Sequence, residues 1–269
     1  MNTRLRTDVV PTLRQGWNIQ TRVIGALMLR ELTTRFGREN IGFLWIMAEP
    51  LLFAGLVGLL WRVTKGPLVS GVDVIAFTIT GYIPLVFFRS NIGRAVSSFT
   101  ANGGLLYHRQ IKVLDLILVR FLVEFIGHLM AYFFIAVVLM AFDIFPMPHD
   151  LGFLILGWLY YALFTLSVTL VVAPLSEMSE VVEKFVPVTT YMMVPFSGAF
   201  FFVSSLYPDA AAVALWSPPV HGMEMMRYGV FGPSIDPHYN FLYPLEFSII
   251  TLTLGLLLCR RVRRLMVIE

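Results

Sequence analysis

Long apolar runs separated by short polar connections make up most of the chain. A transmembrane helix needs about 20 predominantly apolar residues to cross the hydrocarbon core of a bilayer. Six segments meet or approach that length, and they cover residues 41–61, 74–88, 113–142, 151–175, 185–203 and 241–259. The spacing therefore predicts an all-α integral membrane protein with six transmembrane helices.

The segment before the first apolar run, residues 17–36, is too polar to span and has an amphipathic pattern instead. On a helical wheel its apolar residues form one face, and Arg22, Arg30 and Thr33 lie opposite. The apolar face consists of Trp17, Val23, Ile24, Leu27, Met28 and Leu32. This pattern predicts a helix on the inner membrane surface with its apolar face in the lipid boundary, and an ordinary solvated helix is the alternative.

Residues 204–240 mix apolar side chains with prolines that would interrupt a continuous spanning helix. These are Pro208, Pro218, Pro219, Pro233 and Pro237. They exclude a seventh span and predict an external re-entrant hairpin, in which short helices near 209–216 and 221–228 dip into the outer leaflet. A plain external loop would fit the same composition.

Composition and charge agree with a membrane location. The chain is 57% hydrophobic and 14% charged, with a mean hydropathy of +0.76, which excludes a water-soluble globular domain. Lys and Arg concentrate before the first span, between the second and third, and after the sixth, so both termini are expected in the cytoplasm. The chain then divides into a cytoplasmic segment (1–40), a six-helix transmembrane domain (41–259) and a cytoplasmic tail (260–269). The net charge of +3 follows from this topology and does not indicate a nucleic-acid partner.

Several ionisable residues lie within the predicted spans. Arg120, Glu124 and His128 are four residues apart and therefore share one helical stripe. A proton relay is one reading of this stripe, but we favour a structural pair between Arg120 and Glu124, with His128 hydrogen-bonded to a neighbour. Glu49, a few residues into the first span, either faces a cavity or partner or reaches back to the interface.

The string RELTTRFGRENIGFLWIMAEP at residues 30–50 joins the basic surface segment to the first span. Gly42 allows the surface helix to turn into the membrane, Trp45 suits the interfacial belt, and Pro50 can kink the span. An Arg-rich helix followed by GFLW and a proline resembles the start of ABC-2-type permeases, and among them the capsule-polysaccharide exporters. The layout is similar too, with six spans, a short cytoplasmic helical link and a proline-broken external hairpin.

The resemblance implies the permease subunit of an exporter in the bacterial inner membrane. It would work as a homodimer and move an acidic, lipid-anchored capsular polysaccharide or another glycolipid. No phosphate-binding loop of the GxxxxGK[ST] type occurs in the chain, so ATP and Mg are expected on two copies of a separate ABC ATPase subunit. The chain itself is then expected to bind no cofactor or metal. Periplasmic and outer-membrane export proteins are further expected partners.

Three groups of residues are candidates for this function. The ATPase is expected to dock on cytoplasmic connections that contain Phe99, Leu105, Tyr107, His108, Glu177 and Glu180, unless these are solvated connectors. The substrate pathway is expected to include Glu49, Tyr82, Arg89, Arg94, Tyr191, Phe196, Phe200, Tyr207 and Trp216. Aromatic rings pack on the apolar faces of sugars, and arginines pair with phosphate or carboxylate. Arg35 and Arg38 would attract anionic cargo on the cytoplasmic side. Ordinary packing and positive-inside anchoring explain the same residues without a cargo.

Two other functions fit parts of the pattern. The same architecture could move another glycan, a lipid or a drug, because nothing in the apolar spans excludes such a cargo. A membrane-embedded glycan transferase would need clustered acid, base or metal-binding groups near one membrane face. The remaining histidines are scattered along the sequence without a carboxylate partnership, at His108, His149, His221 and His238. We therefore expect a transporter subunit without catalytic residues.

Overall fold

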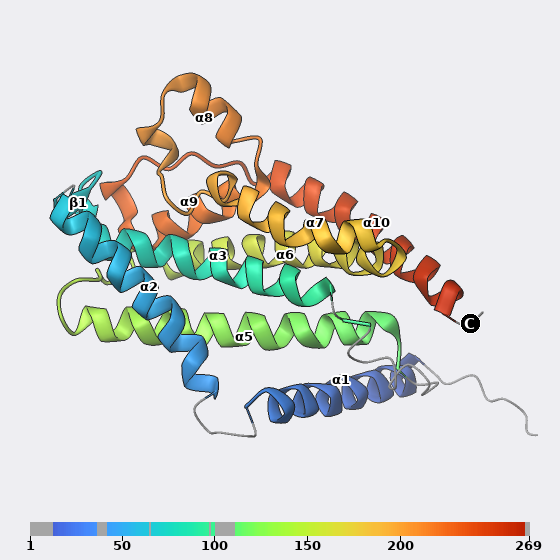
Figure 1. Ribbon diagram of the computed structural model, residues 1–269. Helices are drawn as coiled ribbons and strands as arrows, with labels where there is room; N and C mark the ends of the chain where they lie inside the picture. The colour runs from blue at the N-terminus through green and yellow to red at the C-terminus, as the bar shows by residue number, and fades with distance from the viewer. Residues whose placement is uncertain (1–12, 37–41, 65, 97, 100–110, 267–269) are drawn as a thin grey trace, which may run out of the picture.

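Helices dominate the computed structural model, which describes residues 13–36, 42–64, 66–96, 98–99 and 111–266 (Figure 1). The α-helices are α1 (Leu13–Phe36), α2 (Gly42–Thr64), α3 (Val74–Val96), α5 (Val113–Met140), α6 (Leu151–Met178), α7 (Glu180–Met192), α8 (Pro208–Ala214), α9 (Pro218–Phe231) and α10 (Leu242–Met266). A two-stranded antiparallel hairpin, β1 (Leu68–Val69) and β2 (Val72–Asp73), connects α2 to α3. Three short 3₁₀ turns follow α7 and α9: η2 (Val194–Phe196), η3 (Val203–Ser205) and η4 (Gly232–Ser234).

Four helices of the described chain are long and apolar enough to cross a bilayer. They are α3, α5, α6 and the part of α10 from Leu242 to Arg264, and they pack side by side in one bundle (Figure 1). In α2 the described apolar part, Leu51–Thr64, is shorter. The helical class and the membrane character expected from the apolar runs are therefore confirmed.

The predicted fifth span, residues 185–203, is not a continuous helix. Helix α7 ends at Met192, and the chain continues through η2 and a turn in which Gly198 has a φ of +75°. Pro195 has no N–H to donate and disfavours helical geometry in the residue before it. Gly198 then allows the left-handed conformation of the turn. The apolar run thus continues past the point where the helix stops.

The predicted second span was too short at its carboxyl end. Helix α3 continues to Val96, so Arg89 and Arg94 lie on the helix and not in a connection. The prediction stopped at residue 88 because the apolar run ends there, whereas the helix continues to Val96 and its Arg94 pairs with Glu124 of α5. The connection expected at 176–184 is also mostly helical, since only Ser179 separates α6 from α7.

Helix α1 covers the segment predicted to be amphipathic, and part of its apolar face packs on α5. Leu27 is buried against Leu116 and Val119 of α5, and Val23 and Met28 pack on the same cluster. These apolar side chains therefore pack on another helix. Each Å² of apolar area buried in this contact stabilises the fold by about 25 cal/mol. Trp17, expected on that face, is 70% exposed.

The proline-rich stretch forms the two short helices expected there, α8 and α9. Helix α9 is almost wholly buried and packs tightly along α6. The close approach requires glycine, because a Cβ on Gly157 would lie 2.5 Å from the backbone nitrogen of Met226, and one on Gly229 would lie 2.3 Å from that of Leu154. Helix α8 projects away from the bundle at the top of Figure 1.

The helices define two ends of the bundle. Ala95 of α3, Val113 of α5, Ala173 of α6 and Cys259 of α10 form one apolar cluster, so the ends of α3, α5 and α10 that border basic segments lie together with the carboxyl end of α6. We call this the basic end. At the other end, the backbone N–H of Asp150 donates to the carbonyl of Gly229, which joins the start of α6 to α9. We call this the hairpin end.

Candidate functional site

Two candidate pathway residues of α3 lie on one face of that helix. Tyr82 and Arg89 are seven residues apart, which is about two turns. The ring of Phe53 on α2 stacks on Tyr82 with 4.2 Å between centroids, and the guanidinium of Arg89 lies 4.1 Å from the ring centroid of Tyr191 on α7. We call these four residues the α3 stripe. It combines exposed aromatic surface, since Tyr191 is 63% exposed, with a positive charge.

The α3 stripe has features suited to an acidic sugar. Arg89 is half-buried, and its Nε is buried with no hydrogen-bond partner among the described residues. Stacking on Tyr191 orients the guanidinium through a cation–π interaction and leaves donors available for an anionic group. Only 7% of Tyr82 is exposed, whereas Phe53 is 43% exposed and presents the ring surface at that level.

The other aromatic candidates lie nearer the hairpin end. Tyr207 and Trp216, which flank α8, are 86% and 82% exposed, and Phe196 is 46% exposed. The carbonyl oxygen of Trp216 accepts a hydrogen bond of 2.5 Å from the hydroxyl of Tyr243, at the start of α10. Phe200 packs edge-on against Trp61 of α2. These residues therefore form a group separate from the α3 stripe.

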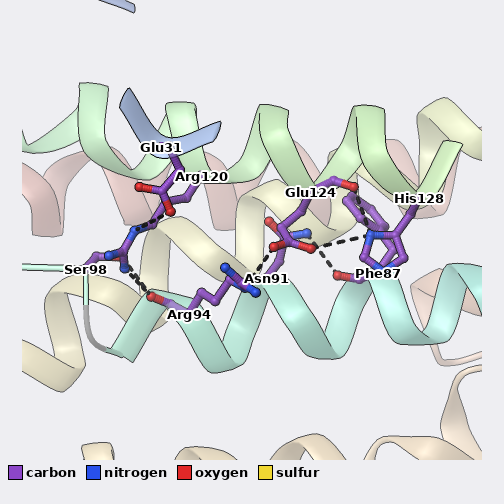
Figure 2. Close-up of polar contacts among 8 residues, drawn as sticks. All are labelled: Glu31, Phe87, Asn91, Arg94, Ser98, Arg120, Glu124 and His128. Carbon is purple, nitrogen blue, oxygen red and sulfur yellow. Dashed lines mark hydrogen bonds and ion pairs between the residues drawn. The ribbon is translucent and has the colours of Figure 1, made fainter. Parts of the chain in front are cut away.

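An ion pair with a buried carboxylate and a 39% exposed arginine side chain joins α3 to α5 at the basic end (Figure 2). Oε1 of Glu124 lies 2.8 Å from Nε of Arg94, and Glu124 is 1% exposed. Nδ1 of His128 lies 2.9 Å from the carbonyl oxygen of Glu124 and 3.4 Å from its Oε2. Arg94, a candidate for cargo binding, thus also pairs with a residue of α5.

Arg120 does not form the pair with Glu124 expected from their spacing. Its Nη1 donates 2.7 Å to the carbonyl oxygen of Arg94 and 3.0 Å to Oγ of Ser98, and its Nε lies 3.9 Å from Oε1 of Glu31 on α1 (Figure 2). The i, i+4 spacing was compatible with pairing, but each side chain reaches a partner on a neighbouring helix. The prediction for His128 is confirmed.

Sequence reasoning missed Arg227, a fully buried residue of α9. Its guanidinium donates to the carbonyl oxygens of Gly198, Ala199 and Phe201 at 2.7, 2.6 and 2.5 Å, and thereby holds the turn that follows α7. Burial lowers the pKa of Arg227 to about 10, while the charge of Glu224 opposes the shift, so the guanidinium stays charged at neutral pH. An arginine three residues after Glu224 in a mostly apolar segment that begins with two prolines was the available signal.

Glu224, on the same helix, fixes the rest of the hairpin. Its two carboxylate oxygens accept hydrogen bonds from the backbone N–H groups of Val203, at 3.3 Å, and His238, at 3.1 Å. Burial raises the pKa of Glu224, and the charge of Arg227 together with both backbone donors counteracts that rise. Glu224 and Arg227 thus connect the segments on both sides of α8 and α9.

The expected docking residues fall into different environments. Phe99 is 2% exposed in the apolar cluster at the basic end, so it supports the bundle and does not belong to an exposed surface. Glu177 and Glu180, at the α6–α7 junction, are exposed. Leu105, Tyr107, His108 and Arg38 lie outside the described residues. Arg35 lies on α1 and Glu49 on α2, but their side chains are outside the described part of the structure.

Among the described residues, no group of three or more His, Cys, Asp or Glu side chains could hold a metal ion. The described buried charges instead form ion pairs between helices, as Glu124 does, or bind backbone groups, as Glu224 and Arg227 do. The geometry offers an aromatic and basic stripe and two buried polar networks within a membrane bundle.

Comparison with known proteins gives a family and several relatives. Residues 22–231 match the family described as ABC-2 type transporter. A capsule polysaccharide export inner-membrane protein, CtrC of Neisseria meningitidis serogroup B, is 41% identical over 88% of this chain and 90% of its own length. The protein of the same description named BexB, from Haemophilus influenzae, is 36% identical over 93% and 94%. The polysialic acid transport protein KpsM of Escherichia coli is 28% identical over 92% and 96%.

Proposed function

The chain belongs to the ABC-2 type transporter family, and on this basis we propose that it is the membrane-spanning permease subunit of an ATP-driven exporter of capsular polysaccharide. The observation that carries the proposal is similarity over nearly the whole length to relatives named for capsule polysaccharide export. In this role the chain has no catalytic residue. A separate ABC ATPase subunit binds ATP and Mg and supplies the energy.

The proposed assembly contains two copies of this chain and two ATPase subunits in the bacterial inner membrane. Each copy crosses the membrane six times, through α2, α3, α5, α6, the broken segment of α7 with its following turn, and α10. Helices α8 and α9 form a re-entrant hairpin on the outer side. The concentration of arginines at the basic end supports cytoplasmic termini. Periplasmic and outer-membrane export proteins would receive the polymer.

We propose the α3 stripe as part of the cargo pathway. Exposed rings provide sequence-tolerant surfaces for the apolar faces of sugars, and Arg89 provides a charge for a carboxylate or phosphate. Arg35 and Arg38 would attract such groups on the cytoplasmic side, and Phe196, Tyr207 and Trp216 would line the exit. The exposed Glu177 and Glu180 support docking of the ATPase at the α6–α7 junction.

The test uses the chain and its ATPase subunit reconstituted together in proteoliposomes. A purified acidic capsular polysaccharide should stimulate ATP hydrolysis and move across the bilayer, whereas small hydrophobic compounds should do neither. In cells, deletion of the ATPase should stop polymer from reaching the surface while the chain remains in the membrane. Polymer export that persists without any ATPase would refute the proposal.

The role of the α3 stripe is tested in the same system. The Arg89→Gln variant should raise the polymer concentration for half-maximal stimulation about tenfold, equivalent to about 1.4 kcal/mol of binding free energy. Arg62→Gln is the matched control, because Arg62 lies near the hairpin end of α2 and pairs with Asp73 at the surface. If both variants and the unaltered chain needed the same polymer concentration for half-maximal stimulation, Arg89 would be excluded from the pathway.

A further inference from the structure

Arg120 connects α5 to two other elements at once (Figure 2). Its guanidinium donates to the backbone carbonyl of Arg94 and to Oγ of Ser98, and its opposite edge faces Glu31 of α1. The last carbonyl groups of a helix have no partner within that helix. Arg120 therefore caps the carboxyl end of α3 from a neighbouring helix, and its side chain is only 14% exposed.

The same end of α3 is held a second time, one turn further along α5. Glu124 pairs with the side chain of Arg94, the residue whose carbonyl oxygen accepts from Arg120. One residue of α3 is thus fixed at both its backbone and its side chain by two residues of α5. Charge-assisted contacts of this kind are about twice as strong as neutral hydrogen bonds.

Helix α1 is fixed to α5 at further points beside Glu31. Leu27 packs on Leu116 and Val119, and the side-chain amide of Gln20 donates to the carboxylate of Asp115. Asp115 also accepts a 2.9 Å hydrogen bond from the backbone N–H of Lys112, at the start of α5. Helix α1, the start of α5 and the end of α3 are therefore joined by contacts that share α5.

We propose that Arg120 is a positioning residue of the transport cycle, which couples the connection that begins at Ser98 to α3 and α1. The inference rests on the proposed function, because it assumes an ATPase that acts at the basic end. Ser98 is also joined to α3 directly, because its Oγ donates 3.0 Å to the carbonyl oxygen of Arg94. A displacement of this end of α3 is transmitted to α5 and α1 through the shared guanidinium. Arg89 and Tyr82 lie five and twelve residues before Arg94 on the same helix, so the α3 stripe moves with that end.

The arrangement favours arginine, because Nη1 makes both hydrogen bonds while Nε faces Glu31 at 3.9 Å. A guanidinium presents several donors in a fixed plane, so it can serve the carbonyl of Arg94, Ser98 and Glu31 together, whereas a lysine ammonium is a compact point charge on a flexible stem. Arg120→Lys keeps the charge and loses this geometry. Arg120→Gln loses both.

The experiment compares variants of the reconstituted permease–ATPase complex. The measured quantity is polymer exported per ATP hydrolysed, together with the basal ATPase rate and the recovery of intact complex. Arg120→Gln should assemble and hydrolyse ATP, but its ratio should fall about fivefold or more, the lower range of typical coupling free energies. Arg120→Lys should restore part of the ratio, and Arg22→Gln, at an exposed position of α1, should leave it unchanged.

The outcomes separate a coupling role from a purely structural one. An assembled Arg120→Gln complex with an unchanged ratio overturns the inference. If this variant does not assemble, Glu31→Gln and Ser98→Ala decide, because each removes one partner of the guanidinium and leaves its others. Ser98→Ala also removes the hydrogen bond from Oγ of Ser98 to the carbonyl oxygen of Arg94. An unchanged ratio in both overturns the inference, and a reduced ratio in either supports it. Failure of the unaltered complex to export polymer would instead refute the proposed function.

Discussion

Arg94 and Arg62 each form an ion pair, but in different environments. Arg94 pairs at 2.8 Å with Glu124, which is 1% exposed, whereas Arg62 pairs at 3.9 Å with an aspartate at the surface. Removing one partner of a buried pair leaves an uncompensated charge. Arg94→Ala should therefore lower the free energy of unfolding by about 3 kcal/mol. Arg62→Ala should lower it by less than about 1 kcal/mol.

Both values are measured by denaturant unfolding of the detergent-solubilised protein, followed by circular dichroism. The two substitutions delete the same atoms, so their difference reports the environment of the pair. Equal losses of unfolding free energy in the two variants would show that Glu124 is accessible to solvent and not buried between α3 and α5.

Arg227 makes a second residue-scale prediction. Arg227→Met retains most of the side-chain volume but leaves the carbonyls of Gly198, Ala199 and Phe201 without their donor. Each orphaned buried carbonyl costs about 1–3 kcal/mol, so the total loss should be several kcal/mol. Limited proteolysis should then cut the chain near residues 198–201 faster than in the unaltered protein. The cleavage rate of Arg227→Lys should lie between those of Arg227→Met and the unaltered protein. Cleavage of Arg227→Met at the rate of the unaltered protein would contradict the role assigned to Arg227.

At the scale of elements, the contact between α6 and α9 depends on glycine. A Cβ at Gly157 would lie 2.5 Å from the backbone nitrogen of Met226 and 2.7 Å from the carbonyl oxygen of Gly222, so the helices would have to separate. Gly157→Ala should destabilise the fold by about 1–3 kcal/mol through overpacking. Gly25→Ala on α1, where no atom lies within 4 Å, should instead stabilise by about 0.5–1 kcal/mol.

Thermal unfolding in detergent measures both effects, and the opposite signs make the pair diagnostic. A stabilising effect of Gly157→Ala would show that α9 does not pack on α6 at this distance. Loss of polymer export with an unchanged unfolding temperature would show that the glycine serves the transport cycle and not the packing.

The sequence predicted elements better than contacts, for a physical reason. The length of an apolar run is a local property of the sequence. It located the ends of α5 and α6 within a few residues. The pairing of Arg94 with Glu124 depends on how two helices pack, which i, i+4 spacing along α5 cannot show. The break after Met192 was present in the sequence as Pro195 and Gly198, but the surrounding apolar residues outweighed it. Arg227 was visible as a basic residue three positions after Glu224, without any sign of the carbonyls it binds.

At the scale of the whole molecule, the two ends of the bundle predict a pattern of chemical labelling. The only cysteine, Cys259, is buried, so a Cys259→Ala background can carry single cysteines at exposed positions. Met147 and Tyr207 lie at the hairpin end and are 82% and 86% exposed, whereas Glu180 follows α6 at the basic end.

With the arginine-rich end in the cytoplasm, Met147→Cys and Tyr207→Cys should react in intact spheroplasts with a membrane-impermeant maleimide. Glu180→Cys should react only after the membrane is permeabilised. Because these three positions lie on both sides of the broken α7 segment, labelling of Met147→Cys and Tyr207→Cys on opposite sides would show that this segment does not complete a crossing. The six-span topology would then be wrong, and labelling of Glu180→Cys alone in spheroplasts would reverse the orientation.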